Sequence, residues 1–375
     1  MASTALARSV WVIYGIIVFE ILFMISPFAF YYYSAYAMPL NWLAAQPSTA
    51  WLVQHILPHF AYHTSTTAKT MLIVAWPIIF LGLVMFIIAF AQIYWAKFTG
   101  KGAVSVGLYR SIRHPQYVAL AIIGLGTTMY WSRFLILIAF IAMLFMYYAL
   151  SLAEEARCRQ QFGADYEDYV SRTGRFLPKS WTAWLPALPV LSLSGGQWIA
   201  VCFALWVVVT AVSVAGGFAA KRAVIDRMQT VERPGFVLLA LAPVPSLKPW
   251  TSLIDESSAI RSRLSRAGDG NVIAYLAPAT WSIPELGLSP NERYEIPARD
   301  ELLHPAQHGN SLEFDRRYWR ILFTRAEGVA DPGRLLMTSM GITPLFQVEV
   351  AEGVITDLID RPGSSFWSGI PVPIY

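Results

Sequence analysis

Ionisable and aromatic side chains gather in residues 107–117, directly before a long apolar run; we call this the first polar stretch. It carries Tyr109, Arg110, Arg113, His114 and Tyr117. Polar groups at the mouth of a membrane span are costly unless they serve a cavity, a partner or a ligand. The basic side chains can donate to an anionic group, and the tyrosines offer aromatic faces. The pattern therefore indicates a site for an anionic or aromatic ligand; a basic anchor that binds lipid phosphates is the alternative.

A second polar stretch, residues 153–178, follows the next apolar run. It carries Glu154, Glu155, Phe162, Gly163, Tyr166, Tyr169, Arg175 and Pro178. If the intervening apolar residues form a helical hairpin, both stretches emerge on one face and the carboxylates meet the basic groups. A sulfonium cofactor would suit this mixture, because its amino group favours a carboxylate, its carboxylate favours arginine, and its cationic sulfur favours aromatic faces. The alternative is a salt-bridge network that only closes the bundle.

The apolar runs that must position these stretches are long enough to cross a membrane. Of the 375 residues, 56% are hydrophobic and 14% charged, whereas a soluble domain carries about a quarter charged residues. Runs near the roughly 20 residues that a span needs cover residues 10–33, 71–94, 116–152 and 197–218. The third run reads as two spans hinged at Ser132-Arg133. We therefore predict an all-α polytopic membrane bundle of about five transmembrane helices, in which Gly124 and Gly126 allow close helix contacts.

Charge is distributed unevenly along the chain. Residues 1–218 hold 12 Lys/Arg and 6 Asp/Glu, whereas residues 219–375 hold 16 and 18. The basic excess thus lies among the apolar segments, where it acts on lipid and on orientation, and no basic run predicts nucleic-acid binding. The positive-inside rule places the N-terminus and both polar stretches on the cytoplasmic side of a bacterial inner membrane, with residues 219–375 in the periplasm. Lys221 and Arg222 argue against that last placement.

Residues 219–375 read as a small soluble α+β domain that follows the membrane domain of residues 1–218. A helix is expected from a cap at Asp255 to about Arg266. Short apolar runs predict strands at residues 272–276, 319–323, 335–340, 346–350 and 354–359. The last two form a hairpin around Gly353. We expect any protein partner to bind through this domain.

No metal site is expected, although histidines recur at a regular spacing. Histidines recur every four residues at two places, His55, His59 and His63, and His304 and His308. Pro58 and Pro305 interrupt the helices that this spacing would require. The two cysteines, Cys158 and Cys202, show no zinc or redox spacing.

Five ordered motifs connect the two polar stretches to a known group of enzymes. They are Arg113-His114-Pro115-x-Tyr117, Glu154-Glu155, Phe162-Gly163, Tyr166-x-x-Tyr169 and Arg175-Phe-Leu-Pro178. This order resembles the isoprenylcysteine carboxyl methyltransferase and phospholipid methyltransferase group of membrane enzymes. Methanethiol methyltransferases and NnrU-like proteins have a similar layout. The resemblance covers residues 95–180.

The resemblance implies S-adenosylmethionine as cofactor, in a pocket capped by the second polar stretch. The residues implied for cofactor binding are Tyr109, His114, Pro115, Tyr117, Glu154 and Glu155. Those considered for catalysis are Arg113, His114, Glu155 and Arg175, with the arginines orienting a carboxylate acceptor and His114 or a glutamate serving as base for an amine or thiol. The expected acceptor is lipophilic or small: a prenylcysteine-type carboxylate, a phospholipid amine or a thiol, entering from the membrane lipid.

The sequence departs from the family pattern at two positions, and Ala119 together with the long segment 219–375 motivates an alternative. Ala119 stands where the family usually has glycine, and Cys158 where leucine is common. The long segment 219–375 has no counterpart in short bacterial relatives. A non-catalytic membrane subunit, with a degenerate methyltransferase core that anchors residues 219–375 to a partner complex, is therefore the alternative function. A membrane reductase of the sterol type would need a nicotinamide site, for which the sequence contains no separate motif.

Overall fold

The computed structural model describes residues 22, 24–34, 40, 42–43, 46, 48–57, 65–99, 104–182, 195–267, 272–281, 314–325 and 343–360. The chain forms two compact units. The first, the helical unit, comprises residues 1–34, 73–130 and 136–213. The second, the sheet unit, comprises residues 35–72, 131–135 and 214–375.

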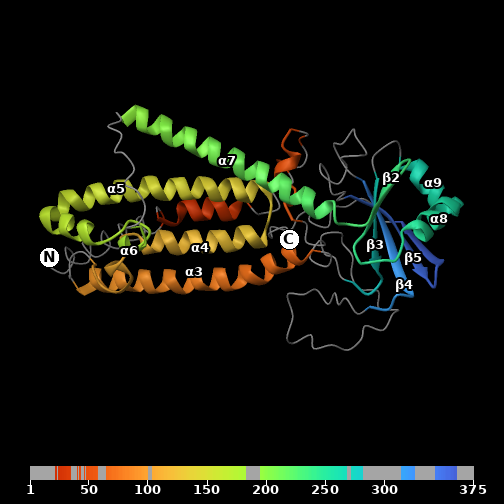
Figure 1. The fold of residues 1–375 in the computed structure, drawn as a ribbon, viewed down its shortest axis with the longest axis horizontal. Coiled ribbons are helices and arrows are strands. Elements are labelled where there is room, and N and C mark those ends of the chain that lie inside the picture. Colours follow the sequence, from red (N-terminus) through yellow and green to blue (C-terminus); the bar gives the residue numbers. More distant parts are fainter. Residues whose placement is uncertain are drawn as a thin grey trace, which may run out of the picture. The chain divides into compact units, whose positions relative to one another are not determined.

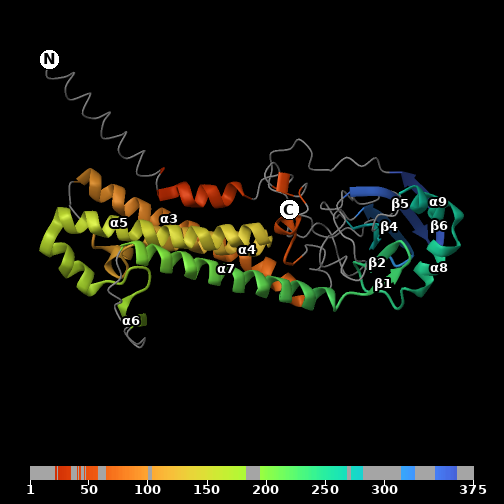
Figure 2. The same ribbon diagram turned by 90° about the horizontal axis from the view of Figure 1, so that it is seen from above.

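Long helices make up the helical unit and extend into the sheet unit at their ends. They are α3 (Thr66–Thr99), α4 (Pro115–Tyr130), α5 (Phe134–Arg172) and α7 (Gly195–Ile225), with the shorter α6 (Lys179–Thr182) and the 3₁₀ turns η1 (Ala50–Val53) and η3 (Gly107–Arg110). Residues 24–33 are also helical. α3, α4 and α5 run alongside one another in both views (Figure 1, Figure 2).

The predicted hairpin is confirmed, because α4 ends at Tyr130 and α5 begins at Phe134, on either side of the hinge. Three helices of the described residues, α3, α5 and α7, are long and apolar enough to cross a membrane. α4 has 16 residues, fewer than the roughly 20 that a straight span needs. Most of the predicted span at 10–33 lies outside the described residues. The count of five transmembrane helices stays a prediction.

Glycines bring α4 close to both neighbours, as the sequence predicts. A Cβ on Gly126 would lie 2.6 Å from Ile79 of α3, and one on Gly124 would lie 2.7 Å from Met143 of α5. The helical residues 24–33 also pack on α4, because the hydroxyl of Tyr31 donates to the Gly124 carbonyl oxygen at 2.9 Å. Small residues of this kind fix helix pairs where lipid supplies no hydrophobic drive between them.

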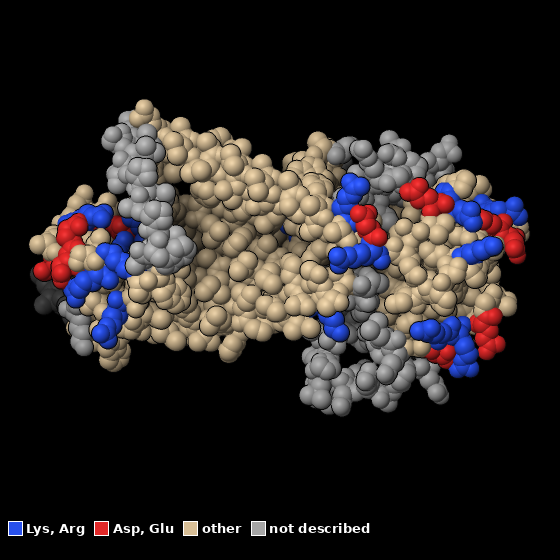
Figure 3. Space-filling model, viewed as in Figure 1, with Lys and Arg blue, Asp and Glu red and all other residues tan. Residues whose placement is uncertain are grey.

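The face of the helical unit shown in Figure 3 carries no Lys, Arg, Asp or Glu along the middle of its long helices. Charged side chains gather instead around the C-terminal end of α5. Large apolar side chains are exposed along the helices, among them Phe80 at 68%, Ile87 at 57% and Phe203 at 63%. An apolar surface of this extent needs lipid around it, so the helical unit is an integral membrane domain.

The sheet unit contains one six-stranded sheet in the order β1-β2-β3-β4-β5-β6. The strands are β1 (Thr230–Arg233), β2 (Phe236–Ala240), β3 (Val272–Pro278), β4 (Tyr318–Arg325), β5 (Thr343–Ala351) and β6 (Val354–Asp360). β2 and β3 are parallel and all other neighbours antiparallel. The predicted hairpin is confirmed as β5–β6, with Gly353 at a φ of 81° in its turn. The α+β prediction is thereby confirmed, while residues 335–340 lie outside the described residues.

Two short helices connect β2 to β3, where the sequence predicts one. α8 covers Lys248–Glu256 and α9 covers Ser258–Arg266. The predicted cap at Asp255 is wrong, because Asp255 lies in the last turn of α8. Ser257 has an extended backbone and its side chain accepts a hydrogen bond from the Ile260 amide at 3.3 Å. It is therefore Ser257 that caps α9.

The hydrophobic core of the sheet unit draws on residues from outside 219–375. Leu57 and Ala68, from before and within the start of α3, belong to the same buried cluster as the strands. Val224, near the end of α7, and Met228 also belong to it. α7 itself continues to Ile225. The sheet is therefore packed together with chain segments that lead into and out of the membrane helices.

Candidate functional site

Main-chain hydrogen bonds join the two polar stretches. The Arg113 amide donates to the Gly174 carbonyl at 2.9 Å, and the His114 amide donates to the Arg175 carbonyl at 3.1 Å. The Gly174 amide donates to the Ser111 carbonyl at 3.2 Å. The segment after α5 thus folds back beside the start of α4. The hairpin prediction that both stretches meet on one face is confirmed.

Glu155 is the centre of a buried ion cluster. Its side chain is fully buried, and it accepts bonds from Arg113 Nε at 2.9 Å and Arg175 Nη2 at 2.7 Å. His114 Nε2 lies 3.3 Å from the same carboxylate. Arg113 also donates to the Thr173 carbonyl. A buried carboxylate is tolerated when cations and hydrogen bonds satisfy it in this way.

Glu154, one residue earlier on α5, is in a different environment. Its side chain is 45% exposed, and it accepts a hydrogen bond from the Tyr117 hydroxyl. His114 Nδ1 lies 3.4 Å from its other oxygen. The His114 ring stacks on the Tyr117 ring with 5.5 Å between the ring centroids, and Tyr117 stacks on Tyr147 with 4.7 Å between the centroids. A half-exposed carboxylate therefore lies beside a column of aromatic rings.

His114 is positioned between the two carboxylates, one on each ring nitrogen. Burial lowers the pKa of His114, but the hydrogen bonds and charges of Glu154 and Glu155 outweigh burial and raise that pKa above the ordinary value. Both ring nitrogens can donate only when the imidazole is protonated. The two carboxylates therefore favour the protonated, positively charged form of His114.

This charge predicts a pH dependence of stability. A histidine whose folded-state pKa is raised contributes stability that is fully present below its unfolded pKa, about 6.5, and is lost as the pH rises through the folded value. We expect the thermal midpoint of the detergent-solubilised protein to fall as the pH rises from 6.5 into the alkaline range. His114→Asn should flatten that slope. An identical slope in the variant would show that another group is responsible.

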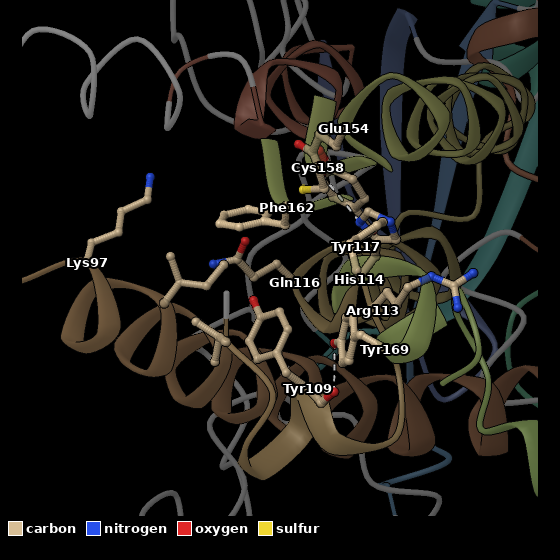
Figure 4. A pocket seen from close by; sticks show the side chains of 13 residues that line it. Lys97, Tyr109, Arg113, His114, Gln116, Tyr117, Glu154, Cys158, Phe162 and Tyr169 are labelled. Carbon is tan, nitrogen blue, oxygen red and sulfur yellow. Dashed lines mark hydrogen bonds and ion pairs between the residues drawn. The ribbon is translucent and has the colours of Figure 1, made fainter. Parts of the chain in front are cut away.

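A cavity of about 240 Å³ lies between α3, the first polar stretch and α5 (Figure 4). It is lined by Ile93, Lys97, Val104, Tyr109, Arg113, His114, Gln116, Tyr117, Glu154, Cys158, Phe162, Tyr166 and Tyr169. Glu154, Cys158 and Phe162 recur every four residues on α5, so they share one helix face. Ligand pockets in proteins have this character: apolar and aromatic walls with a few polar groups.

Residues 66–165 match the family model described as phospholipid methyltransferase. The match covers less than half of the chain, and the matched segment is similar to the phospholipid methyltransferase family. It comprises α3, α4 and most of α5, and includes every cavity-lining residue except Tyr166 and Tyr169. No curated protein and no solved structure matches the chain in the two other comparisons.

The predicted site residues fall into two groups. Tyr109, Arg113, His114, Tyr117 and Glu154 line the cavity. Pro115, Glu155 and Arg175 do not line it. Pro115 is the first residue of α4, and Glu155 and Arg175 belong to the ion cluster behind the cavity wall. The structure thus brings all eight residues together but gives only five of them access to a ligand.

Several residues that line the cavity could not be selected from the motifs. Gln116 occupies the variable position of the Arg-His-Pro-x-Tyr motif, so no rule selects it. Cys158 could be found from its place four residues after Glu154, on the same helix face. Lys97 and Ile93 come from α3, which has no motif, and only the packing of α3 brings them to the cavity.

Ala119, the departure from the family pattern, is fully buried where α4 meets α3. A Cβ on Gly82 of α3 would lie 2.9 Å from the Ala119 carbonyl oxygen. Ala119 does not line the cavity. Its methyl group therefore takes no room from a ligand in the cavity.

Among the described residues, no three His, Cys, Asp or Glu side chains are arranged to hold a metal ion. His55 is described, and its backbone pairs with Arg133 as an isolated bridge. The other histidines of the two repeats lie outside the described residues: His59, His63, His304 and His308.

Proposed function

We propose that this protein is an S-adenosylmethionine-dependent membrane methyltransferase that acts on a lipophilic or small acceptor. One observation carries the proposal. The family motifs converge on a single cavity, in which a half-exposed carboxylate, Glu154, lies beside stacked aromatic rings. The family to which residues 66–165 are similar supports the class of reaction.

The side chains of the cavity fit the chemistry of the cofactor. S-adenosylmethionine supplies a methyl group on a positively charged sulfur. Glu154 can accept hydrogen bonds from its amino group, and such charge-assisted bonds are about twice as strong as neutral ones. The faces of Tyr117 and of other lining tyrosines can accommodate a cation. The Arg113 side chain lines the same cavity, while its guanidinium is held by Glu155 and by the Thr173 carbonyl.

The chain would act mainly by positioning and by excluding water. A carboxylate acceptor needs no base. For an amine or thiol acceptor, Glu154 is the better proton acceptor, because it is half exposed at the cavity, whereas two carboxylates favour the protonated form of His114. Glu155 and Arg175 act on this arrangement from behind, by holding Arg113 and His114 in place.

Of the two features that motivated the alternative of a non-catalytic subunit, one no longer supports it. It was motivated by Ala119, which lies away from the cavity, and by the segment 219–375. That segment still predicts a protein partner. The membrane orientation, with the polar stretches cytoplasmic and residues 219–375 periplasmic, also stays a prediction.

The proposal is tested by cofactor binding to purified protein in detergent, measured by isothermal titration calorimetry. Loss of a hydrogen bond to a charged group costs about 1.5–3 kcal/mol, so Glu154→Gln should weaken S-adenosylmethionine binding by roughly tenfold to a hundredfold. Glu167→Gln is the matched control, because Glu167 is an exposed carboxylate on the same helix. Absence of binding to the unmodified protein at millimolar cofactor would refute the proposal.

A further inference from the structure

Tyr109 carries a buried hydroxyl that has no hydrogen-bond partner among the residues that the structure describes. The residue is only 5% exposed, its hydroxyl oxygen is fully enclosed and unpaired, and it lines the cavity. An unmet buried hydroxyl costs about 1–3 kcal/mol, so its retention calls for an explanation. Burial raises the pKa of Tyr109, which keeps the phenol protonated and able to donate.

The position of Tyr109 is fixed by its neighbours. The Tyr169 hydroxyl donates to the Tyr109 carbonyl oxygen at 2.7 Å. The adjacent Leu108 amide donates to Gln92 Oε1 of α3 at 3.2 Å. η3 is therefore held from both sides, and the phenol points into the cavity (Figure 4).

Gln116 lies next to this phenol. It is 8% exposed and lines the cavity, and its side-chain amide forms no hydrogen bond with the residues that the structure describes. Figure 4 shows the Tyr109 hydroxyl pointing toward the Gln116 amide, with the Phe162 ring beside them. The ammonium group of Lys97 extends away from these three side chains. The result is a neutral part of the cavity with a phenol donor, an amide donor and acceptor, and an aromatic face.

This set of groups suits a planar nitrogen heterocycle. A carboxamide offers a donor and an acceptor side by side, which is the pattern that pairs with the amino group and ring nitrogen of adenine. Aromatic rings bind the flat face of a base by stacking. Ionic headgroups such as phosphates, carboxylates or ammonium groups would require an opposite charge, which Tyr109, Gln116 and Phe162 do not supply.

We propose that Tyr109 and Gln116 recognise the edge of an adenine-type base, with Phe162 against its face, and so determine which purine the cavity accepts. This inference rests on the proposed function, since it assigns the base of the cofactor to one part of the cavity. The charged part, with Glu154 and His114, is left for the amino-acid portion.

The test compares two stable ligands, S-adenosyl-L-homocysteine and its 6-oxo counterpart S-inosyl-L-homocysteine, by calorimetry on the full chain in detergent. Each correct pairing of an amide with adenine discriminates by about 1–3 kcal/mol, so the unmodified protein should prefer the adenosyl ligand by roughly fivefold to a hundredfold. Gln116→Leu keeps the size of the side chain but removes both polar atoms. This variant should bind the adenosyl and inosyl ligands with nearly equal affinity.

Tyr109→Phe provides a second, independent readout. Losing one neutral hydrogen bond should weaken adenosyl binding by about threefold to tenfold. The thermal midpoint of the ligand-free variant should stay level or rise, because the deleted hydroxyl has no partner among the described residues. A purely structural tyrosine would show the reverse, with a lower midpoint.

The outcomes separate this inference from the proposed function. If the unmodified protein binds neither ligand, the proposed function fails and the inference fails with it. If it binds the adenosyl ligand but Gln116→Leu retains the full preference over the inosyl ligand, the assignment of Gln116 is wrong while the proposed function stands.

Discussion

Replacing Gly174 with alanine should dismantle the candidate site. A Cβ at this position would lie 1.7 Å from the Leu177 carbonyl oxygen and 2.9 Å from the Leu177 carbonyl carbon. Both atoms belong to the backbone, so no side-chain rotation can relieve the clash and the chain itself must move. Gly174 also exchanges main-chain hydrogen bonds with Ser111 and Arg113. Any shift would therefore separate the two polar stretches.

We expect Gly174→Ala to lower the free energy of unfolding by about 3 kcal/mol or more, at the upper end for overpacking, and to abolish measurable cofactor binding. Thermal unfolding in detergent, followed by circular dichroism, provides the first measurement. Gly196→Ala is the matched control, because no atom lies within 4 Å of a Cβ there. That change should be neutral or slightly stabilising in a helix. Equal midpoints for the two variants would contradict the clash.

The meeting of the two polar stretches could be predicted because it depends on hairpin geometry alone. The hinge at Ser132-Arg133 divides one apolar run into α4 and α5, and any helical hairpin returns the chain to the face it left. Gly124 and Gly126 were readable for a similar reason, since small residues within a membrane helix have few other uses. Local sequence patterns that allow only one geometry are therefore the ones from which structure can be predicted.

The different environments of Glu154 and Glu155 could not be predicted from the sequence. Adjacent helical residues point about 100° apart, so one carboxylate faces the cavity and the other faces the arginines. Which is which depends on the rotation of α5 against α3 and α4, and no local pattern encodes that rotation. Gln116 escaped prediction for the same reason, because only the packing of α3 and α5 closes a cavity around it.

The sheet unit shows a second limit. Phe236–Ala240 forms β2 with every residue buried, and a short apolar run buried on both faces has no alternation to distinguish a strand from a helix. β1, Thr230–Arg233, is mostly exposed and polar, so it lacks a hydrophobic pattern altogether. The β5–β6 hairpin was found because its turn is marked by a glycine with positive φ.

Replacing Glu155 with alanine should be the most destabilising change to the ion cluster. It would leave Arg113, whose side chain is 9% exposed, without the carboxylate that accepts its Nε–H. Arg175, at 24% exposed, would lose two hydrogen bonds to the same group. Breaking a buried pair by removing one partner costs about 3–5 kcal/mol. We expect a loss of that size in the unfolding free energy, measured in mixed detergent micelles.

Asp168→Ala on the same helix is the control, because its pair with Arg172 is 65% and 68% exposed. Exposed pairs contribute about 0–1 kcal/mol, so the losses of unfolding free energy in the two variants should differ by several-fold.

Variants of Glu155 and Glu154 should also differ in whether they change stability or cofactor binding. Glu155→Ala is expected to lower stability first and binding as a consequence, whereas Glu154→Gln should weaken cofactor binding with little change in stability, since Glu154 is half exposed. If Glu154→Gln destabilised the protein as much as Glu155→Ala, both carboxylates would belong to one structural network and Glu154 would lose its assignment as a ligand-binding group.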